Sequence, residues 1–227
     1  MSQREPTLST AAPDAAVDAF LDALVALPGS DRLFNFYRDH DPTVENADAP
    51  SIRRDNLRRV LAWHGSRAAT DLWLGEAPAW SGTRQSGVPF VGEYALPLLS
   101  GRLGLDPPLR RATRTAEPAR STQTAREIWR ALEAAPMPLF WNAVPFHPHP
   151  LGEPRRNRTP GVREIEAARP LLAALVELAG VRRILCVGRI AERAAAHLEL
   201  PRVPVRHPAQ GGAAAFRLGA ARFLAQT

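Results

Sequence analysis

Short apolar runs alternate with amphipathic segments of helix length along most of the chain. Four apolar runs have the length of strands, at residues 70–75, 137–144, 182–188 and 203–207. Segments with a helical spacing of apolar positions lie between and after them, at residues 92–104, 124–135, 161–180, 190–200 and 213–226. This alternation is typical of a parallel sheet with crossover helices. We therefore predict an α/β fold: a three-layer sandwich with a central four-stranded parallel sheet flanked by helices.

The N-terminal part of the chain has a different pattern. Residues 1–12 are small and polar, which predicts a disordered tail. An amphipathic helix is expected over residues 15–27, with Asp14 as its N-cap. A second is expected over residues 52–65, with a strongly basic outer face. Neither helix carries an obvious chemical group for catalysis.

The composition indicates one domain. With 227 residues, 45% of them hydrophobic, the chain can bury one substantial core, and no linker divides it. We expect a single monomeric domain over residues 13–227, with its motifs at residues 70–225. No stretch approaches the roughly 18 apolar residues of a membrane span, and the start does not resemble a signal peptide. The single cysteine, Cys186, lies in an apolar run and is expected to be buried; a reducing, cytoplasmic location fits best.

The charged residues are unusual because all 29 basic residues are arginine, with a net charge of +6. Arginine suits phosphate contacts, so this balance modestly favours a nucleic-acid partner, although a genome rich in G and C would produce the same bias. The absence of lysine excludes a Schiff base formed by a lysine amine. Phosphate-loop and dinucleotide motifs are also absent, which disfavours enzymes with nucleotide cofactors.

The four apolar runs end in segments rich in polar residues, glycine and proline. These segments read "GEAPAW", "NAVPFHPHP", "VGR" and "HPAQGG". In an open parallel sheet the carboxyl ends of the strands meet at one edge. We therefore expect Glu76, Asn142, His147, His149 and His207 to share a crevice there.

Taken together, "GEAPAW…GVPFVGE", "NAVPFHPH" and "HPAQGG" resemble the motifs of the uracil-DNA glycosylase superfamily, in the same order and at strand ends. The resemblance implies that Gly75, Glu76, Ala77 and Pro78 form the first motif, and that Glu76 positions or activates the attacking water. A carboxylate suits this reaction because positive charge develops on the sugar in the transition state. The alternative is that Glu76 only forms a salt bridge with a nearby arginine.

The resemblance also assigns roles in base recognition. Phe90 would stack on the extruded base, Asn142 would read its hydrogen-bonding edge, and His207 would donate a hydrogen bond to the carbonyl oxygen that gains negative charge. Gln210 would line the same site. The alternatives are core packing for Phe90, a turn cap for Asn142 and a structural role for His207.

Further candidates lie outside these motifs. Glu93 is a second catalytic candidate, but it also suits the start of a helix for structural reasons. In the loop "FHPHPLGEPRRNRTPG", Arg155, Arg156 and Arg158 are expected to meet DNA phosphates, unless they form a solvated charge run. A zinc site made of His147, His149 and Glu153 is less favoured, because the spacing lacks the usual supporting ligands. We expect no metal and no cofactor.

The departures from the family pattern refine the hypothesis. One cysteine cannot hold the four-cysteine iron-sulfur cluster of some members. No bulky apolar residue precedes Phe216 in "AQGGAAAF", so the chain lacks a strong wedge to fill the gap left by a flipped base, and single-stranded or mismatched DNA should be preferred.

These features predict a monofunctional DNA glycosylase acting on uracil or another deaminated base in base excision repair. It should lack lyase activity, since the chain has no lysine. Two alternatives stay open: a catalytically weak nucleic-acid-binding member of the same fold, and a metal-dependent small-molecule hydrolase.

Overall fold

The centre of the molecule is a parallel sheet. The computed structural model describes residues 11–67, 70–118, 122–133 and 135–226. Within them, four parallel strands lie in the order β3-β2-β5-β6. Their bounds are β2 (Thr70–Gly75), β3 (Leu139–Asn142), β5 (Val181–Val187) and β6 (Arg202–Val205). The predicted four-stranded parallel sheet is confirmed, and each strand falls on one of the four apolar runs.

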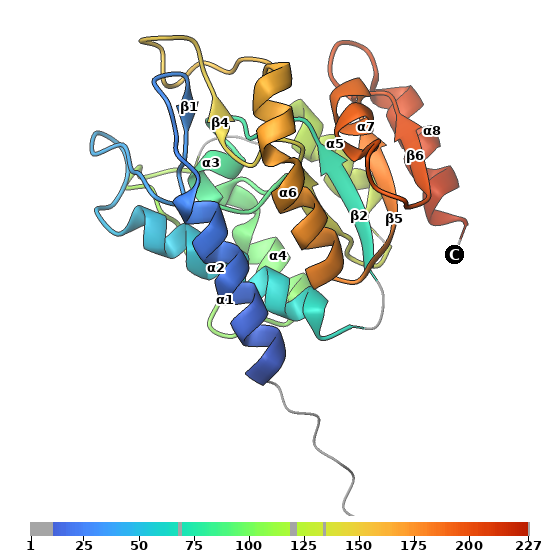
Figure 1. Cartoon of the computed structure of the whole chain (residues 1–227), viewed down its shortest axis with the longest axis horizontal. Helices are drawn as coiled ribbons and strands as arrows, with labels where there is room; N and C mark the ends of the chain where they lie inside the picture. The colour runs from blue at the N-terminus through green and yellow to red at the C-terminus, as the bar shows by residue number, and fades with distance from the viewer. Residues whose placement is uncertain (1–10, 68–69, 119–121, 134, 227) are drawn as a thin grey trace, which may run out of the picture.

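Helices cover both faces of the sheet. Side chains alternate along β2, so Leu72 and Leu74 join one hydrophobic cluster and Trp73 joins the other. The first cluster includes residues of α1 (Ala11–Ala26), α6 (Val162–Leu178) and α7 (Arg189–Ala195). The second includes residues of α4 (Leu96–Leu103), α5 (Gln123–Ala131) and α8 (Ala213–Leu224). Figure 1 shows α6 in front of the sheet with α4 and α5 behind it, which confirms the three-layer prediction.

The N-terminal helices begin earlier than predicted. Helix α1 starts at Ala11 instead of after Asp14, so only residues 1–10 of the expected tail remain, and these lie outside the described residues. Helix α2 (Ala49–Gly65) starts three residues before the predicted segment. Pro50 is in its first turn, where a backbone N–H group would have no partner within the helix, so the N–H that proline lacks is not needed. It packs against α1.

The expectation of a basic outer face on α2 is wrong for Arg53. Its guanidinium is fully buried and lies 2.8 Å from the buried carboxylate of Glu45. It also donates to the backbone carbonyls of Phe36 and Gln85. Because a buried charge is tolerated only when it is paired and hydrogen-bonded, these contacts explain why an arginine can occupy a core position.

Several short elements were not predicted. An antiparallel pair joins β1 (Leu33–Phe34) to β4 (His147–Pro148) at the start of the long loop after β3. The segment expected as one helix over 92–104 is a 3-10 turn, η1 (Glu93–Ala95), followed by α4. A four-residue helix, α3 (Thr83–Ser86), lies between β2 and η1. Helix α7 ends at Ala195, short of the expected residue 200.

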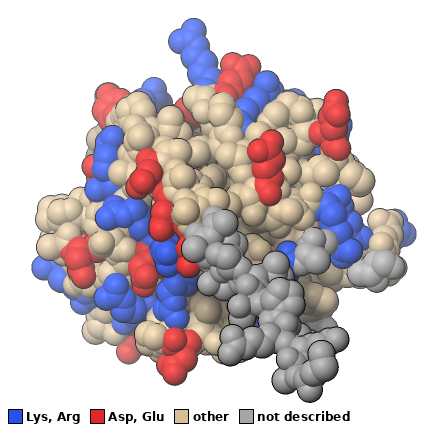
Figure 2. Space-filling view, turned by 60° about the horizontal axis from the view of Figure 1, so that its bottom comes forward, with Lys and Arg blue, Asp and Glu red and all other residues tan. Residues whose placement is uncertain are grey.

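The core position expected for Cys186 is confirmed, and the surface in Figure 2 carries charges of both signs. Cys186 is fully buried in β5. No helix within the described ranges is both long and apolar enough to cross a membrane. On the face that Figure 2 shows, arginine and acidic side chains are interspersed, so this face offers no continuous positive surface.

Candidate active site

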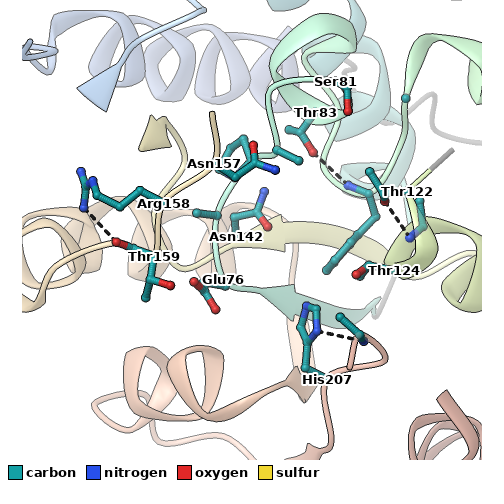
Figure 3. Close-up of a pocket in the computed structure, with 18 of the residues that line it drawn as sticks. Glu76, Ser81, Thr83, Thr122, Thr124, Asn142, Asn157, Arg158, Thr159 and His207 are labelled. Atoms are coloured by element: carbon teal, nitrogen blue, oxygen red, sulfur yellow. Dashed lines mark hydrogen bonds between the residues drawn. The ribbon is translucent and has the colours of Figure 1, made fainter. Parts of the chain in front are cut away.

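A cavity of about 470 Å³ opens at the carboxyl edge of the sheet. Small-molecule sites in proteins typically measure about 300–1,000 Å³. The loop after β2 lines it with Glu76, Ala77 and Pro78, β3 with Asn142, and the loop after β6 with His207 and Gln210. Figure 3 shows Glu76, Asn142 and His207 around this one cavity. The structure thus brings together residues that are more than 130 positions apart in the sequence.

The first motif is held by the pairing of β2 with β3. Gly75 lies opposite Asn142 in the strand register. The amide of Ala143 donates to the carbonyl of Gly75 at 2.8 Å, and the amide of Val144 donates to the carbonyl of Glu76 at 3.1 Å. A Cβ atom on Gly75 would meet the ring of Phe90 and approach Asn142 Oδ1 to 2.7 Å. Glycine is therefore required for the close packing of these three residues.

Glu76 is a half-buried carboxylate at the cavity wall. Burial raises its pKa above the usual value, and a side-chain hydrogen bond with Thr159 opposes this shift. No arginine lies within ion-pair distance of Glu76 in the described part of the chain. The geometry thus gives no support to the salt-bridge alternative.

Phe90 lies at the cavity with an unusual backbone. Its φ of 57° is in the left-handed region, which a phenylalanine rarely adopts. Two hydrogen bonds hold it there: its amide donates to Thr83 Oγ1, and its carbonyl accepts from Trp129 Nε1. The ring also packs edge-on against Phe140, with ring centres 5.5 Å apart. Phe90 therefore combines core packing with a place in the cavity lining.

Asn142 offers a free hydrogen-bond donor. The residue is only 3% exposed, and its buried Nδ2 atom has no hydrogen-bond partner among the residues described. Leaving a buried donor unpaired costs about 1–3 kcal/mol. Because Asn142 lines the cavity, its unpaired amide donor is suited to bind a ligand oxygen.

His207 is oriented by the turn that follows it. Its Nδ1 atom accepts a hydrogen bond from the amide of Ala209 at 3.2 Å, so the proton of the neutral ring is on Nε2. Burial lowers the pKa of His207, which favours this neutral form. Gly212 approaches the carbonyl of His207 so closely that a Cβ atom there would collide with it. The glycines of "HPAQGG" thus allow the turn that presents the Nε2 donor.

The structure does not bring Glu93 to the cavity. Its side chain is fully buried and accepts hydrogen bonds from the amides of Ala112 and Thr113, at 2.6 and 2.9 Å, and from the hydroxyl of Thr113. Arg111 Nε lies 3.2 Å away. Both oxygens of Glu93 are therefore engaged in holding the segment at residues 111–113, which is a structural position.

The three arginines expected at phosphates differ in their contacts. Arg155 lies 3.3 Å from Asp41 and donates to Thr43. Arg158 lines the cavity but forms a two-armed ion pair with Glu164, at 2.7 and 3.0 Å. Arg156 pairs only with Glu153 among the described residues, with its side chain 69% exposed. Arg156 is therefore the arginine of this group that is freest to reach a phosphate.

The histidines of the same loop do not form a metal site. His147 and His149 stack with ring centres 5.7 Å apart, but the Nδ1 atoms point to the carbonyls of Pro78 and Pro150. Glu153 is paired with Arg156. No group of three metal-ligating side chains suited to a metal ion occurs in the described ranges. Neither His147 nor His149 lines the cavity, contrary to the shared crevice expected for them.

Several cavity residues were missed at the sequence level. Asn157 and Thr159 come from the loop in which only the arginines were singled out, and Tyr94 and Thr124 come from segments expected to be helical. Uncharged hydroxyl and amide side chains in a loop give no sequence signal by themselves. Their position depends on how the loop folds back over the sheet edge.

The comparison with protein families identifies the superfamily. The model described as "Uracil DNA glycosylase superfamily" matches residues 63–224. The chain belongs to the uracil DNA glycosylase superfamily. The matched range includes all four strands of the sheet and all the residues assigned to the motifs of this superfamily. Cys186, the only cysteine, is buried in β5, so the chain does not fit the iron-sulfur cluster that some superfamily members hold.

A solved structure supports the superfamily fold. The structure of wild-type Pedobacter heparinus SMUG2 matches with a TM-score of 0.58 over 92% of this chain and 95% of that one. At 12% sequence identity, this likeness shows the fold alone. Among curated proteins, the search found no match.

Proposed function

We propose that this chain is a monofunctional DNA glycosylase that hydrolyses the N-glycosidic bond of uracil or another deaminated base. The observation that carries the proposal is the arrangement of three groups at one cavity: the Glu76 carboxylate without an arginine partner, the free Nδ2 donor of Asn142 and the Nε2 donor of His207. This arrangement supports base excision more than it supports the alternative roles, which were a salt bridge for Glu76, a turn cap for Asn142 and a metal site in the loop after β3.

Each group has a distinct role in the proposed reaction. The extruded base stacks on Phe90, and Asn142 Nδ2 donates a hydrogen bond to it. The oxygen of water bonds to C1′ while the C1′–N bond breaks and its electron pair remains on the base. Glu76 stabilises the positive charge on the sugar and accepts the proton of the water. The Nε2–H group of His207 stabilises the negative charge on the carbonyl oxygen of the leaving base.

The product should be an intact abasic site. Breaking the strand by β-elimination usually needs an amine nucleophile, and this chain has no lysine. Strand breaks should therefore appear only after treatment with alkali or heat. Breakage by the purified protein alone would contradict the monofunctional assignment.

The proposal is tested with a uracil-containing oligonucleotide, incubated with chelator and then treated with alkali. We expect cleavage that survives chelation and falls by about 100-fold to 10,000-fold in Glu76→Gln. In His207→Ala it should fall by about 100-fold to 1,000-fold. Glu177→Gln makes the same change as Glu76→Gln at an exposed position on α6 and should leave the rate unchanged. Binding without base release would favour a nucleic-acid-binding role. Loss of activity on chelation would favour a metal-dependent hydrolase.

A further inference from the structure

Phe90 is hydrogen-bonded on both sides of its left-handed backbone. Its φ of 57° is unfavourable for a residue with a side chain, because the Cβ atom crowds the following carbonyl oxygen. The amide of Phe90 donates to Thr83 Oγ1 at 3.2 Å, and its carbonyl accepts from Trp129 Nε1 at 3.3 Å. A backbone in such a sparsely populated region persists only where its surroundings hold it there. The conformation of Phe90 therefore depends on these two side chains.

The two partners come from different elements. Thr83 is the first residue of α3 and is only 5% exposed. It lines the cavity, and Figure 3 shows its hydroxyl engaged in a hydrogen bond there. Trp129 belongs to α5, and its ring packs edge-on against Phe140 with ring centres 6.2 Å apart. Phe90 is thus held between α3 and α5.

The ring of Phe90 occupies a closely defined space. A Cβ atom on Gly75 would collide with this ring and would also lie 2.7 Å from Asn142 Oδ1. On another side the ring packs against Phe140, with ring centres 5.5 Å apart. A backbone that relaxed to a negative φ would direct the ring out of this space. The left-handed conformation therefore places the ring beside the amide of Asn142.

We propose that Thr83 and Trp129 are positioning residues, which keep the backbone of Phe90 left-handed and so hold its ring where the extruded base stacks. The inference rests on the proposed glycosylase function. Neither side chain needs to touch the base, since Thr83 acts through the amide of Phe90 and Trp129 through its carbonyl. Loss of either hydrogen bond lets the backbone relax, and the ring then moves away from Gly75 and Asn142.

The first test compares Thr83→Val, which removes the hydroxyl at nearly constant size, with Thr83→Ser, which keeps it. In single-turnover reactions on a uracil-containing oligonucleotide, we expect Thr83→Val to release the base about three- to tenfold more slowly, because one hydrogen bond is lost. Thr83→Ser should keep the wild-type rate. Trp129→Phe keeps an aromatic ring but removes the Nε1 donor, and it should slow base release by a similar factor. Wild-type rates in Thr83→Val and Trp129→Phe would overturn the inference.

A double variant shows whether Thr83 acts through Phe90. Phe90→Ala removes the stacking ring and should slow base release about tenfold to 100-fold. Adding Thr83→Val to Phe90→Ala should then change the rate little, since the ring that the hydroxyl positions is absent. A threonine with a purely structural role would lower the rate by the same factor with and without the ring, and that result would contradict the inference.

A matched control is available at Thr115. This threonine is exposed, lies outside the cavity lining, and accepts a hydrogen bond from Arg111 at 3.0 Å. Thr115→Val makes the same chemical change as Thr83→Val and should leave the rate of base release at its wild-type value.

The last test does not depend on activity. Hydrogen exchange at the amide of Phe90, followed by NMR, reports directly on its hydrogen bond to Thr83. We expect slow exchange in the wild type and in Thr83→Ser, and faster exchange in Thr83→Val. Exchange that stays slow in Thr83→Val would overturn the inference. Faster exchange in Thr83→Val, together with a wild type that releases no base, would keep the positioning of Phe90 and reject the glycosylase function.

Discussion

Gly75 at the end of β2 lies directly opposite Asn142 at the end of β3, with no space for a side chain between them and Phe90. Gly75→Ala should therefore displace the ring of Phe90 or the side-chain amide of Asn142, the two groups that we propose stack on the base and read it. Overpacking a tight site typically costs about 1–3 kcal/mol of folding stability, and a misplacement of about 1 Å in an active site can cost about 100-fold in rate, so we expect slower base release from a protein that stays folded. The rate on a uracil oligonucleotide and the circular dichroism spectrum measure the two effects.

A matched glycine serves as the control for that variant. Gly101 is an exposed position in α4 where an added Cβ atom would meet nothing within 4 Å. Gly101→Ala should keep the wild-type rate and raise helix stability slightly. Equal rates for the two alanine variants and the wild type would show that the packing around Gly75 does not control the site.

Glu93 should affect stability and not the chemistry. In Glu93→Gln, an amide nitrogen would face the backbone donors of Ala112 or Thr113, and the ion pair with Arg111 would be lost. We expect a loss of about 1–3 kcal/mol in the free energy of unfolding, measured by urea denaturation. The folded fraction should keep the wild-type pH profile of base release. A stable Glu93→Gln protein that is as inactive as Glu76→Gln would reinstate Glu93 as a catalytic residue.

The sheet and the order of the motifs could be predicted from the sequence because both are local signals. Each strand is a short apolar run, and each motif follows a run directly, so the geometry of a parallel sheet brings Glu76, Asn142 and His207 to one edge. The small β1–β4 sheet gave no such signal, since its strands have two residues each.

The contacts that escaped prediction join distant loops. Glu93 begins a short helical turn, as expected of an acidic residue there, but its real partners are 18 to 20 residues further along the chain. Arg53 has the spacing of a surface arginine on α2, and only the folding of the preceding loop places Glu45 against it. Thr159 likewise lies beside Glu76 in the cavity lining because its loop folds back over the sheet edge. Periodicity describes one element at a time and contains no information about such pairs.

Two of the three arginines in "RRNR", Arg156 and Arg158, should behave differently. Arg156→Gln should weaken binding to a single-stranded oligonucleotide and reduce the slope of log affinity against log salt by about 0.7. Arg158→Gln should mainly lower stability, because it leaves Glu164 without its ion-pair partner. Fluorescence anisotropy at several salt concentrations, with urea denaturation of both variants, separates the two effects. An unchanged salt slope in Arg156→Gln would exclude that side chain from the DNA interface.

Acid should destabilise the protein partly through His64. Burial, aided by the charge of Arg67, lowers the pKa of His64 from 6.5 to about 3. Between these values the unfolded state binds more protons, so stability falls as the pH is lowered, by up to about 1.4 kcal/mol per pH unit. His64→Gln removes this titration, and its unfolding free energy should fall less steeply between pH 6 and pH 4, whatever its stability at neutral pH. The same change at the exposed His40 should leave the slope unaltered.

The absence of an apolar wedge should appear in the choice of substrate. Gln210 is exposed at the cavity with a left-handed backbone, and alanines and glycines follow it as far as Phe216, which is buried. No large apolar side chain in this segment is thus placed to enter a base stack. Extruding a base from a duplex costs a few kcal/mol and costs least for single strands and mismatches. Single-turnover rates should therefore be higher for uracil in single-stranded DNA or opposite guanine than for uracil paired with adenine. Equal rates on all three substrates would show that another part of the protein supplies the energy for base extrusion.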